Sequence, residues 1–178
     1  MTHNILIAGF GGQGILFAGK ILVYAGLTAG KEVSWLPSYG PEMRGGTCNC
    51  SVVISDEPIG SPLVTNPDIL IVLNTPSLEK FENTVAENGI ILIDSTMCDA
   101  KVTRTDVRVF DLPATAMADD NDLRGGANII LLGKLFGETG LIDDETFKKA
   151  VEKVVPESKP KLRENDMIAM KLGASYGK

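Results

Sequence analysis

Residues 5–14 of the chain read ILIAGFGGQG, an apolar run of strand type that ends directly in a cluster of glycines. The glycines have the spacing G-x-G-x-x-G, and helical periodicity follows them from Ile15 to Ala29. Glycines between a strand and a helix permit a tight turn and leave the first N–H groups of the helix open to an anion. The sequence therefore predicts a strand at 4–8, a turn and a helix, with these candidate cofactor-binding residues in the turn: Gly9, Gly11, Gly12, Gln13 and Gly14.

The same alternation of strand and helix patterns continues along the chain. Further strands are expected at Lys31–Leu36 (stopped by Pro37), Asn49–Ser55, Asp68–Asn74, Ile90–Asp94 and Val107–Asp111. Further helices are expected at Ser77–Glu87, Asn128–Phe136, Asp143–Val154 and Glu164–Gly173, and Thr115–Asp122 is left unassigned. Alternation of this kind predicts a single α/β domain over residues 1–178, with a mostly parallel, doubly wound, Rossmann-like sheet and helices on both faces.

Composition excludes several classes of partner. The net charge is −6, and Lys and Arg are scattered, so neither nucleic acid nor an anionic membrane surface is expected to bind. No secretory signal and no apolar run near the roughly 18 residues of a membrane span is present. Cys48, Cys50 and Cys98 are odd in number and lack the short spacings of iron–sulfur ligands. We expect a cytoplasmic chain that carries no cluster of its own.

The glycine turn alone does not identify a dinucleotide site. The dinucleotide fingerprint also requires an acid at the end of the second strand, to hold a ribose hydroxyl. Here that strand ends in Ser34-Trp35-Leu36-Pro37-Ser38, and Glu32 stands at its beginning. Two interpretations stay open: an anion site at the start of the helix, or glycines that only let the helix pack closely on the sheet.

The loop after the second strand is the most unusual stretch, reading PSYGPEMRGGT from Pro37 to Thr47. Loops at the carboxyl ends of parallel strands line the ligand crevice of such sheets, so this loop and the glycine turn are expected to converge. An arginine there can hold a phosphate or carboxylate with two hydrogen bonds, and glycines allow close approach. An internal Glu42–Arg44 pair in a rigid loop is the alternative. The candidate binding residues of this loop are Ser38, Tyr39, Arg44, Gly45 and Gly46.

Catalytic groups are scarce. His3 is the only histidine, and its place at the amino terminus predicts a solvated side chain, so no nucleophile with a histidine base can be assembled. Aspartates such as Asp94 are explained by strand ends and helix caps, and no metal site is predicted. Cys48 and Cys50 share one strand face, where buried filler is favoured over a redox pair. A chain with so few catalytic groups looks like part of a larger assembly.

Two long motifs resemble the gamma subunit of 2-oxoacid:ferredoxin oxidoreductases, and the similarity extends to about Val154. The motifs are the glycine turn and the segment Ser38-Tyr39-Gly40-Pro41-Glu42-Met43-Arg44-Gly45-Gly46. Shorter matches follow at Ser51–Ser55, Pro67–Ile71, Asn74–Leu78 and Asn128. The resemblance is greater to 2-oxoglutarate and branched-chain members than to pyruvate members, and a related domain occurs in indolepyruvate oxidoreductases.

The resemblance implies a complex that oxidatively decarboxylates a 2-oxo acid, transfers the acyl group to coenzyme A and reduces ferredoxin. It implies alpha and beta subunits and a ferredoxin-like delta subunit as partners, which bring the thiamine diphosphate and the iron–sulfur clusters. The chain itself would complete the assembly and help to form the coenzyme A or substrate entrance. It could form a homodimer when isolated. Two alternatives remain: a stand-alone nucleotide- or coenzyme A-binding protein, and a scaffold without any ligand.

Overall fold

The computed structural model describes residues 1–39 and 47–177. Its centre is a six-stranded sheet with the order β2-β3-β1-β4-β5-β6. The strands are β1 (Thr2–Phe10), β2 (Glu32–Tyr39), β3 (Thr47–Ser55), β4 (Ile69–Val72), β5 (Ile90–Asp94) and β6 (Arg108–Leu112). The helices are α1 (Ile15–Thr28), α2 (Thr75–Phe81), α3 (Ala114–Asp120), α4 (Ala127–Thr139), α5 (Asp144–Val154) and α6 (Pro160–Ser175), and a 3₁₀ turn, η1 (Glu82–Thr84), follows α2.

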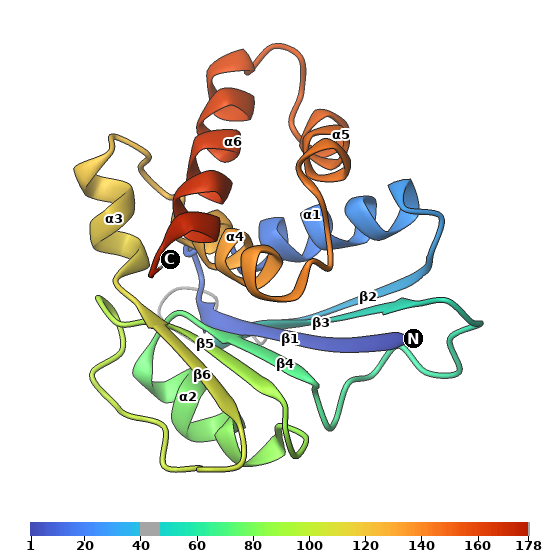
Figure 1. The fold of residues 1–178 in the computed structure, drawn as a ribbon, viewed down its shortest axis with the longest axis vertical. Helices are drawn as coiled ribbons and strands as arrows, with labels where there is room; N and C mark the ends of the chain where they lie inside the picture. Colours follow the sequence, from blue (N-terminus) through green and yellow to red (C-terminus); the bar gives the residue numbers. More distant parts are fainter. Residues whose placement is uncertain (40–46, 178) are drawn as a thin grey trace.

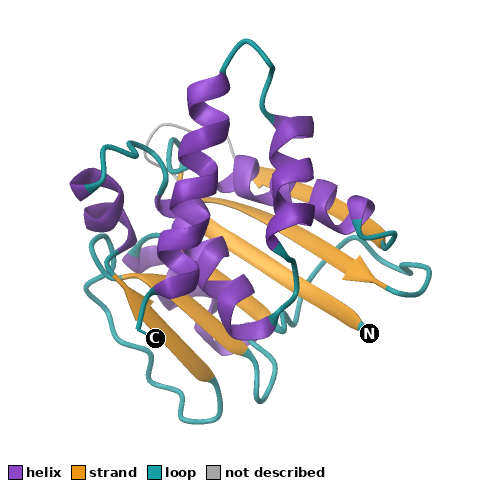
Figure 2. Ribbon diagram, turned by 45° about the horizontal axis from the view of Figure 1, so that its top comes forward, coloured by secondary structure: helices purple, strands orange, loops and turns teal. Residues whose placement is uncertain are grey.

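Helices cover the sheet unequally (Figure 1). Helices α1 and α4 lie against one face, and α5 and α6 pack on the outer side of these two helices (Figures 1 and 2). Helix α2 lies on the opposite face, and α3 stands beyond the end of β6. The predicted α/β class with helices on both faces is confirmed.

The sheet is mostly parallel, because three of its five strand pairs are parallel: β1–β4, β4–β5 and β5–β6. Strand β3 is antiparallel to both of its neighbours, β1 and β2. Strands β1 and β2 therefore run in the same direction with β3 between them. Their carboxyl ends share one edge of the sheet, where Phe10 lies opposite Thr47 and Tyr39 lies opposite Cys48.

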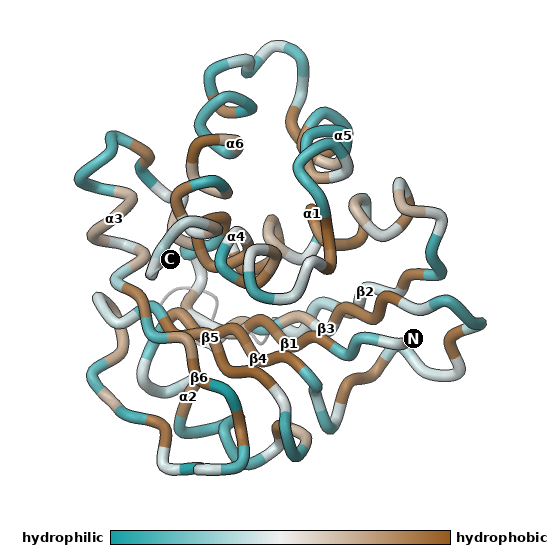
Figure 3. The backbone as a smooth tube through the Cα atoms, in the orientation of Figure 1, coloured by the Kyte–Doolittle hydropathy of each residue, from teal (hydrophilic) through white to brown (hydrophobic). Residues whose placement is uncertain are grey.

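The strands supply most of the core, which appears as brown segments at the centre of Figure 3. Alternate residues of β1 enter two different clusters, because successive side chains of a strand point to opposite faces. Ile5 and Ile7 pack beneath α1 and α4, and Leu6 and Ala8 pack on the side of α2. All four residues of β4 are buried, as expected for a strand covered on both faces.

Two glycines allow helices α4 and α6 to pack closely against each other. A Cβ added to Gly133 would overlap the backbone of Met170, and one added to Gly173 would overlap the backbone of Ile130. Helix α6 therefore docks closely on α4. The docking places the first half of α6 near the loop before α4, where it borders the candidate site.

Several predicted boundaries were wrong for physical reasons. The second strand continues through Pro37 to Tyr39, because β2 is an edge strand and the missing N–H of proline is tolerated there. The helix expected over Ser77–Glu87 ends at Phe81 and is followed by η1. The unassigned segment Thr115–Asp122 forms most of α3.

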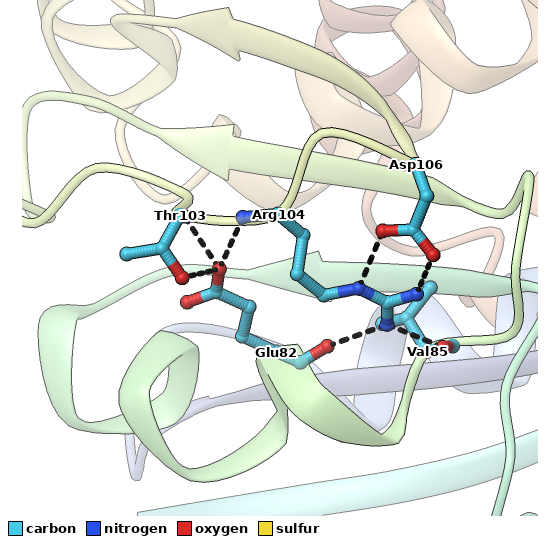
Figure 4. Close-up of polar contacts among 5 residues, drawn as sticks. All are labelled: Glu82, Val85, Thr103, Arg104 and Asp106. Carbon is cyan, nitrogen blue, oxygen red and sulfur yellow. Dashed lines mark hydrogen bonds and ion pairs between the residues drawn. The ribbon is translucent and has the colours of Figure 1, made fainter.

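A charged network fixes η1 to the loop that precedes β6 (Figure 4). Glu82 is buried, and its carboxylate accepts hydrogen bonds from the backbone N–H groups of Thr103 and Arg104, at 2.5 and 3.1 Å, and from the Thr103 hydroxyl. The Arg104 guanidinium donates to both carboxylate oxygens of Asp106 and to the carbonyls of Glu82 and Val85. Because all of these groups are satisfied within the fold, the network is structural.

Candidate functional site

The glycine turn lies where the connections of the sheet change direction. From β1 the chain passes through α1 to β2 on one side, and from β4 it passes through α2 to β5 on the other. Since β1 and β4 are parallel neighbours, their carboxyl ends lie side by side. In open α/β sheets, ligands bind at this point.

Gln13 is fixed by the backbone on both sides of this point. Its Oε1 accepts a hydrogen bond from the N–H of Phe10 at 2.7 Å, and its Nε2 donates to the carbonyl of Leu73 at 2.8 Å. The absence of a side chain at Gly9 gives Gln13 its space, because a Cβ there would lie 2.6 Å from Oε1. Gln13 therefore has a structural function in the turn, and Gly9 allows it.

The other glycines of the turn set its backbone. Gly12 and Gly14 have φ of 96° and 75°, in the left-handed region that favours glycine. Gly14 precedes α1, and its carbonyl accepts a hydrogen bond from Nδ2 of Asn128 at 2.9 Å. The Asn128 side chain thereby joins the start of α4 to the start of α1. Gly11 and Gly12 are exposed.

Two cavities flank Gly12. The first, called the α3 cavity here, has about 200 Å³ and is bordered by Gln13, Leu73, Thr115 and Asp119. The second, called the α6 cavity here, has about 190 Å³ and lies between the turn, the loop before α4 and the first half of α6. Its walls include Gly12, Gly14, Phe17, Arg124, Gly126 and Asp166.

The second predicted group, Ser38 to Gly46, is only partly described. Ser38 and Tyr39 end β2 at the same edge of the sheet as the glycine turn, as expected. The Ser38 side chain, however, lines a different cavity, of about 520 Å³, together with Asn49 of β3 and Lys80 of α2. Arg44, Gly45 and Gly46 lie outside the described residues.

The cysteines belong to the core. Cys48 and Cys50 pack beneath α1 and are 8% and 0% exposed. Burial raises the pKa of Cys50 to about 12, and its Sγ donates to the carbonyl of Ile15. Burial also raises the pKa of Cys48. Both residues are free thiols, which agrees with their predicted role as buried filler.

His3 departs from its prediction. It lies inside β1, opposite Ile54 of β3, and is partly buried, because β1 already includes residues from Thr2 onward. Desolvation by burial lowers its pKa, although Asp68 raises it in part. His3 lies at the amino end of β1, and the glycine turn follows the opposite end of this strand.

Asp94 has a structural role. Asp94 is fully buried at the end of β5, and its carboxylate accepts hydrogen bonds from Thr96 and Thr115 that hold the start of α3. Among the described residues, no group of three or more His, Cys, Asp and Glu side chains could hold a metal ion.

No helix within residues 1–39 and 47–177 is both long enough and apolar enough to cross a membrane.

The residues that line the α6 cavity opposite the glycine turn were not predicted from the sequence. Arg124, Gly125 and Gly126 reach it from the loop before α4, and Asp166 reaches it from α6. One signal was available for Asp166. It stands three, four and seven residues before Ala169, Met170 and Gly173, and these spacings place it on the buried stripe of the helix.

Comparison with known proteins gives consistent relatives. The chain is 43% identical to ketoisovalerate oxidoreductase subunit VorA of Methanothermobacter thermautotrophicus over 98% of its length, and it spans 36% of that protein. It is 38% identical to 2-oxoglutarate synthase subunit KorC of Methanocaldococcus jannaschii, over 100% of this chain and 95% of KorC. The chain thus spans only about a third of its VorA relatives.

Solved structures agree in fold. The gamma subunit of a keto/oxoacid ferredoxin oxidoreductase from Geobacter sulfurreducens superposes with a TM-score of 0.83 at 30% identity, over 98% of this chain and 95% of that one. A 2-oxoglutarate:ferredoxin oxidoreductase from Magnetococcus marinus has the same fold, with a TM-score of 0.86 at 21% identity, over 97% of this chain and 30% of that one. The family model described as pyruvate ferredoxin/flavodoxin oxidoreductase matches residues 4–176. The chain therefore belongs to the pyruvate ferredoxin/flavodoxin oxidoreductase family.

Proposed function

We propose that the chain is the gamma-type subunit of a 2-oxoacid:ferredoxin oxidoreductase. The complex would oxidatively decarboxylate a 2-oxo acid to its acyl-coenzyme A and reduce ferredoxin. The observation that carries the proposal is the family match over residues 4–176, together with a KorC relative aligned over 95% of its own length. Alpha and beta subunits and a ferredoxin-like delta subunit are the proposed partners, and the cytoplasm is the proposed location.

The proposed contribution of this chain is assembly and one wall of a shared site. The described donor groups do not fit an iron–sulfur cluster, because Cys48 and Cys50 are buried in one core cluster and Cys98 in another, on the other face of the sheet. The glycine turn does fit an anionic ligand, since its exposed backbone precedes the start of α1. We propose that Gly11, Gly12 and the loop from Ser38 to Gly46 face coenzyme A in the complex.

We favour 2-oxoglutarate as the substrate. KorC relatives from three genera, each named as subunits of 2-oxoglutarate synthase, are 32–38% identical to the chain over nearly all of its length. Ketoisovalerate is the second candidate, because the VorA relatives are 43% and 39% identical. We place 2-oxoglutarate first because the chain spans 88–95% of the KorC relatives but only 36% of the VorA relatives, and turnover assays test the choice.

Co-purification and turnover test the proposal. A tagged chain expressed from its native host should purify with chains that carry thiamine diphosphate and iron–sulfur clusters. The purified complex should reduce ferredoxin with coenzyme A and 2-oxoglutarate faster than with ketoisovalerate or pyruvate. Recovery of the chain alone, with micromolar binding of a dinucleotide, would instead support the stand-alone nucleotide-binding alternative.

A further inference from the structure

Helix α1 is apolar on the side that faces away from the core as well as on the side that faces it. Its 14 residues include only one charged side chain, that of Lys20. One side of the helix is buried and contributes Ile15, Ile21 and Leu22 to the core. Residues spaced three or four apart share one side of a helix, and such spacings give α1 a second stripe, made of Leu16, Lys20, Val23, Tyr24 and Leu27.

The second stripe is accessible to solvent in the isolated chain. Tyr24 is 38% exposed and Leu27 is 52% exposed, and Leu16 and Val23 are partly buried. A helix that is apolar on all sides is normally buried on all sides, and a contiguous apolar surface marks a contact with another molecule. The outer side of α1 is therefore expected to be covered in the assembled protein.

The stripe forms one wall of a groove, called the α1 groove here, of about 510 Å³. Trp35 of β2 and Val154 at the end of α5 complete its apolar lining. Strand β2 is an edge strand and α5 packs on α1, so the groove lies at one border of the molecule (Figure 1). It shares Phe17 with the α6 cavity but contains no residue of the glycine turn.

The charged residues that line the α1 groove are both lysines. Nζ of Lys20 lies 5.4 Å from the centroid of the Trp35 ring, and Lys153 reaches the groove from the end of α5. Both lysines are exposed, neither forms an ion pair with a described residue, and no described Asp or Glu lines the groove. The positive charge of this border contrasts with the net charge of −6 of the whole chain.

This charge disfavours a second copy of the chain as the occupant. A two-fold interface pairs one patch with the same patch of the other copy, so lysines would meet only lysines. Like charges that face each other across an interface suppress association. An occupant with carboxylates beside apolar side chains would satisfy both features of the groove.

We propose that the α1 groove docks an amphipathic segment of a partner subunit, with apolar side chains between α1 and Trp35 and carboxylates at Lys20 and Lys153. An amphipathic helix in an apolar groove is a recurring mode of recognition, in which apolar anchors supply the affinity and charges fix the orientation. The proposal rests on the proposed function, because the occupant is another chain of the same complex. It adds the surface that receives this chain and the chemistry of the segment that binds there.

Cross-linking of the purified complex tests the charge pairing. A carbodiimide joins lysine amines to carboxylates in direct contact, so mass spectrometry should find Lys20 or Lys153 joined to an Asp or Glu of a partner chain. Lys148 is exposed on α5 but does not line the groove, and it should give no such product. The proposal is wrong if neither groove lysine is linked to a partner chain, or if Lys148 is linked as efficiently as they are.

Co-purification of variants tests the apolar contact. Replacing both Tyr24→Asp and Leu27→Asp should lower the recovery of partner chains with the tagged chain at least about tenfold. Leu63→Asp is the matched control, because Leu63 is 58% exposed and lines the cavity on the side of α2. Its recovery of partner chains should equal that of the wild type. Circular dichroism would verify that both variants are folded, and the cross-linking result is independent of them.

The outcomes separate this proposal from the proposed function. If the wild-type chain purifies without thiamine- and cluster-bearing chains, the proposed function and the docking proposal fail together. If it purifies with them and the double aspartate variant does so equally well, only the docking proposal fails. Equal losses in the double variant and in Leu63→Asp would also contradict it, because the effect would not be confined to the α1 groove.

Discussion

Gln13 joins the turn after β1 to the end of β4: its Nε2 donates to the carbonyl of Leu73 at 2.8 Å while its Oε1 accepts from the N–H of Phe10 at 2.7 Å. One side chain thus satisfies backbone groups on both sides of the point where the sheet connections diverge. The turn is held in shape before any ligand arrives. Such preorganisation reduces the entropy that binding must overcome.

Gln13→Ala should lower the free energy of unfolding by about 1–3 kcal/mol, because it leaves the Phe10 N–H and the Leu73 carbonyl without partners. Urea denaturation followed by circular dichroism measures the change. Asn121→Ala removes an exposed hydrogen bond to Met117 and should cost less than about 1 kcal/mol. Equal losses in the two variants would show that Gln13 does not brace the turn.

Gly14→Ala should destabilise the chain more than Gly30→Ala. Both glycines have φ near 70°, so each alanine variant carries a similar backbone strain of about 1–2 kcal/mol. At Gly30 a Cβ meets nothing within 4 Å, whereas at Gly14 it would collide with the Asn128 amide. We expect an additional loss of about 1–3 kcal/mol for Gly14→Ala in urea denaturation. A difference near zero would mean that Asn128 moves aside without cost.

Local pattern predicted the parallel half of the sheet well, because β4 and β5 are buried on both faces and have continuous apolar sequences. It did not predict the reversed direction of β3, since the residues of a strand do not encode the direction of its neighbour. Nor did it predict that β2 continues through Pro37, because an edge position is a property of the whole sheet. The glycine turn was found for the opposite reason: its backbone requirements are local.

The far wall of the site was not predicted because its residues are distant in sequence. Asp166 follows Gly14 by about 150 residues, and a single acid in a charged helix is ordinarily solvated. Only the close crossing of α4 and α6 brings it to the turn. The two glycines of that crossing, Gly133 and Gly173, carry no local signal that would distinguish packing from flexibility.

Gly173→Ala should destabilise the chain by about 3 kcal/mol and weaken any binding in the α6 cavity. A methyl group at this position would overlap the carbonyl of Ile130, so α6 would have to move away from α4. Thermal unfolding measures the first effect. Gly60→Ala is the control, because a Cβ there meets nothing within 4 Å. A Gly173→Ala variant with wild-type stability would contradict the close crossing.

The three thiols should resist alkylation in the native chain. Cys48, Cys50 and Cys98 are 8%, 0% and 3% exposed, and burial raises the pKa of Cys50 to about 12, so its reactive thiolate is scarce. Iodoacetamide at pH 8, followed by mass spectrometry, should give no modification in minutes, and complete modification in guanidinium chloride. Rapid native modification of Cys50 would contradict its place in the core.

Asp166 should make stability depend on pH between about 4 and 7. Its pKa is raised to about 7 in the folded chain and is about 3.9 when unfolded, so the folded state binds the proton more tightly. The contribution of protonated Asp166 to the free energy of unfolding is therefore complete below pH 4 and is lost as the pH rises through 7. The slope of this loss is at most about 1.4 kcal/mol per pH unit. Urea denaturation across this range should show that slope as the difference between wild type and Asp166→Asn. The exposed Glu164→Gln variant should follow the wild type, and an Asp166→Asn profile parallel to the wild type would place the Asp166 pKa near its ordinary value.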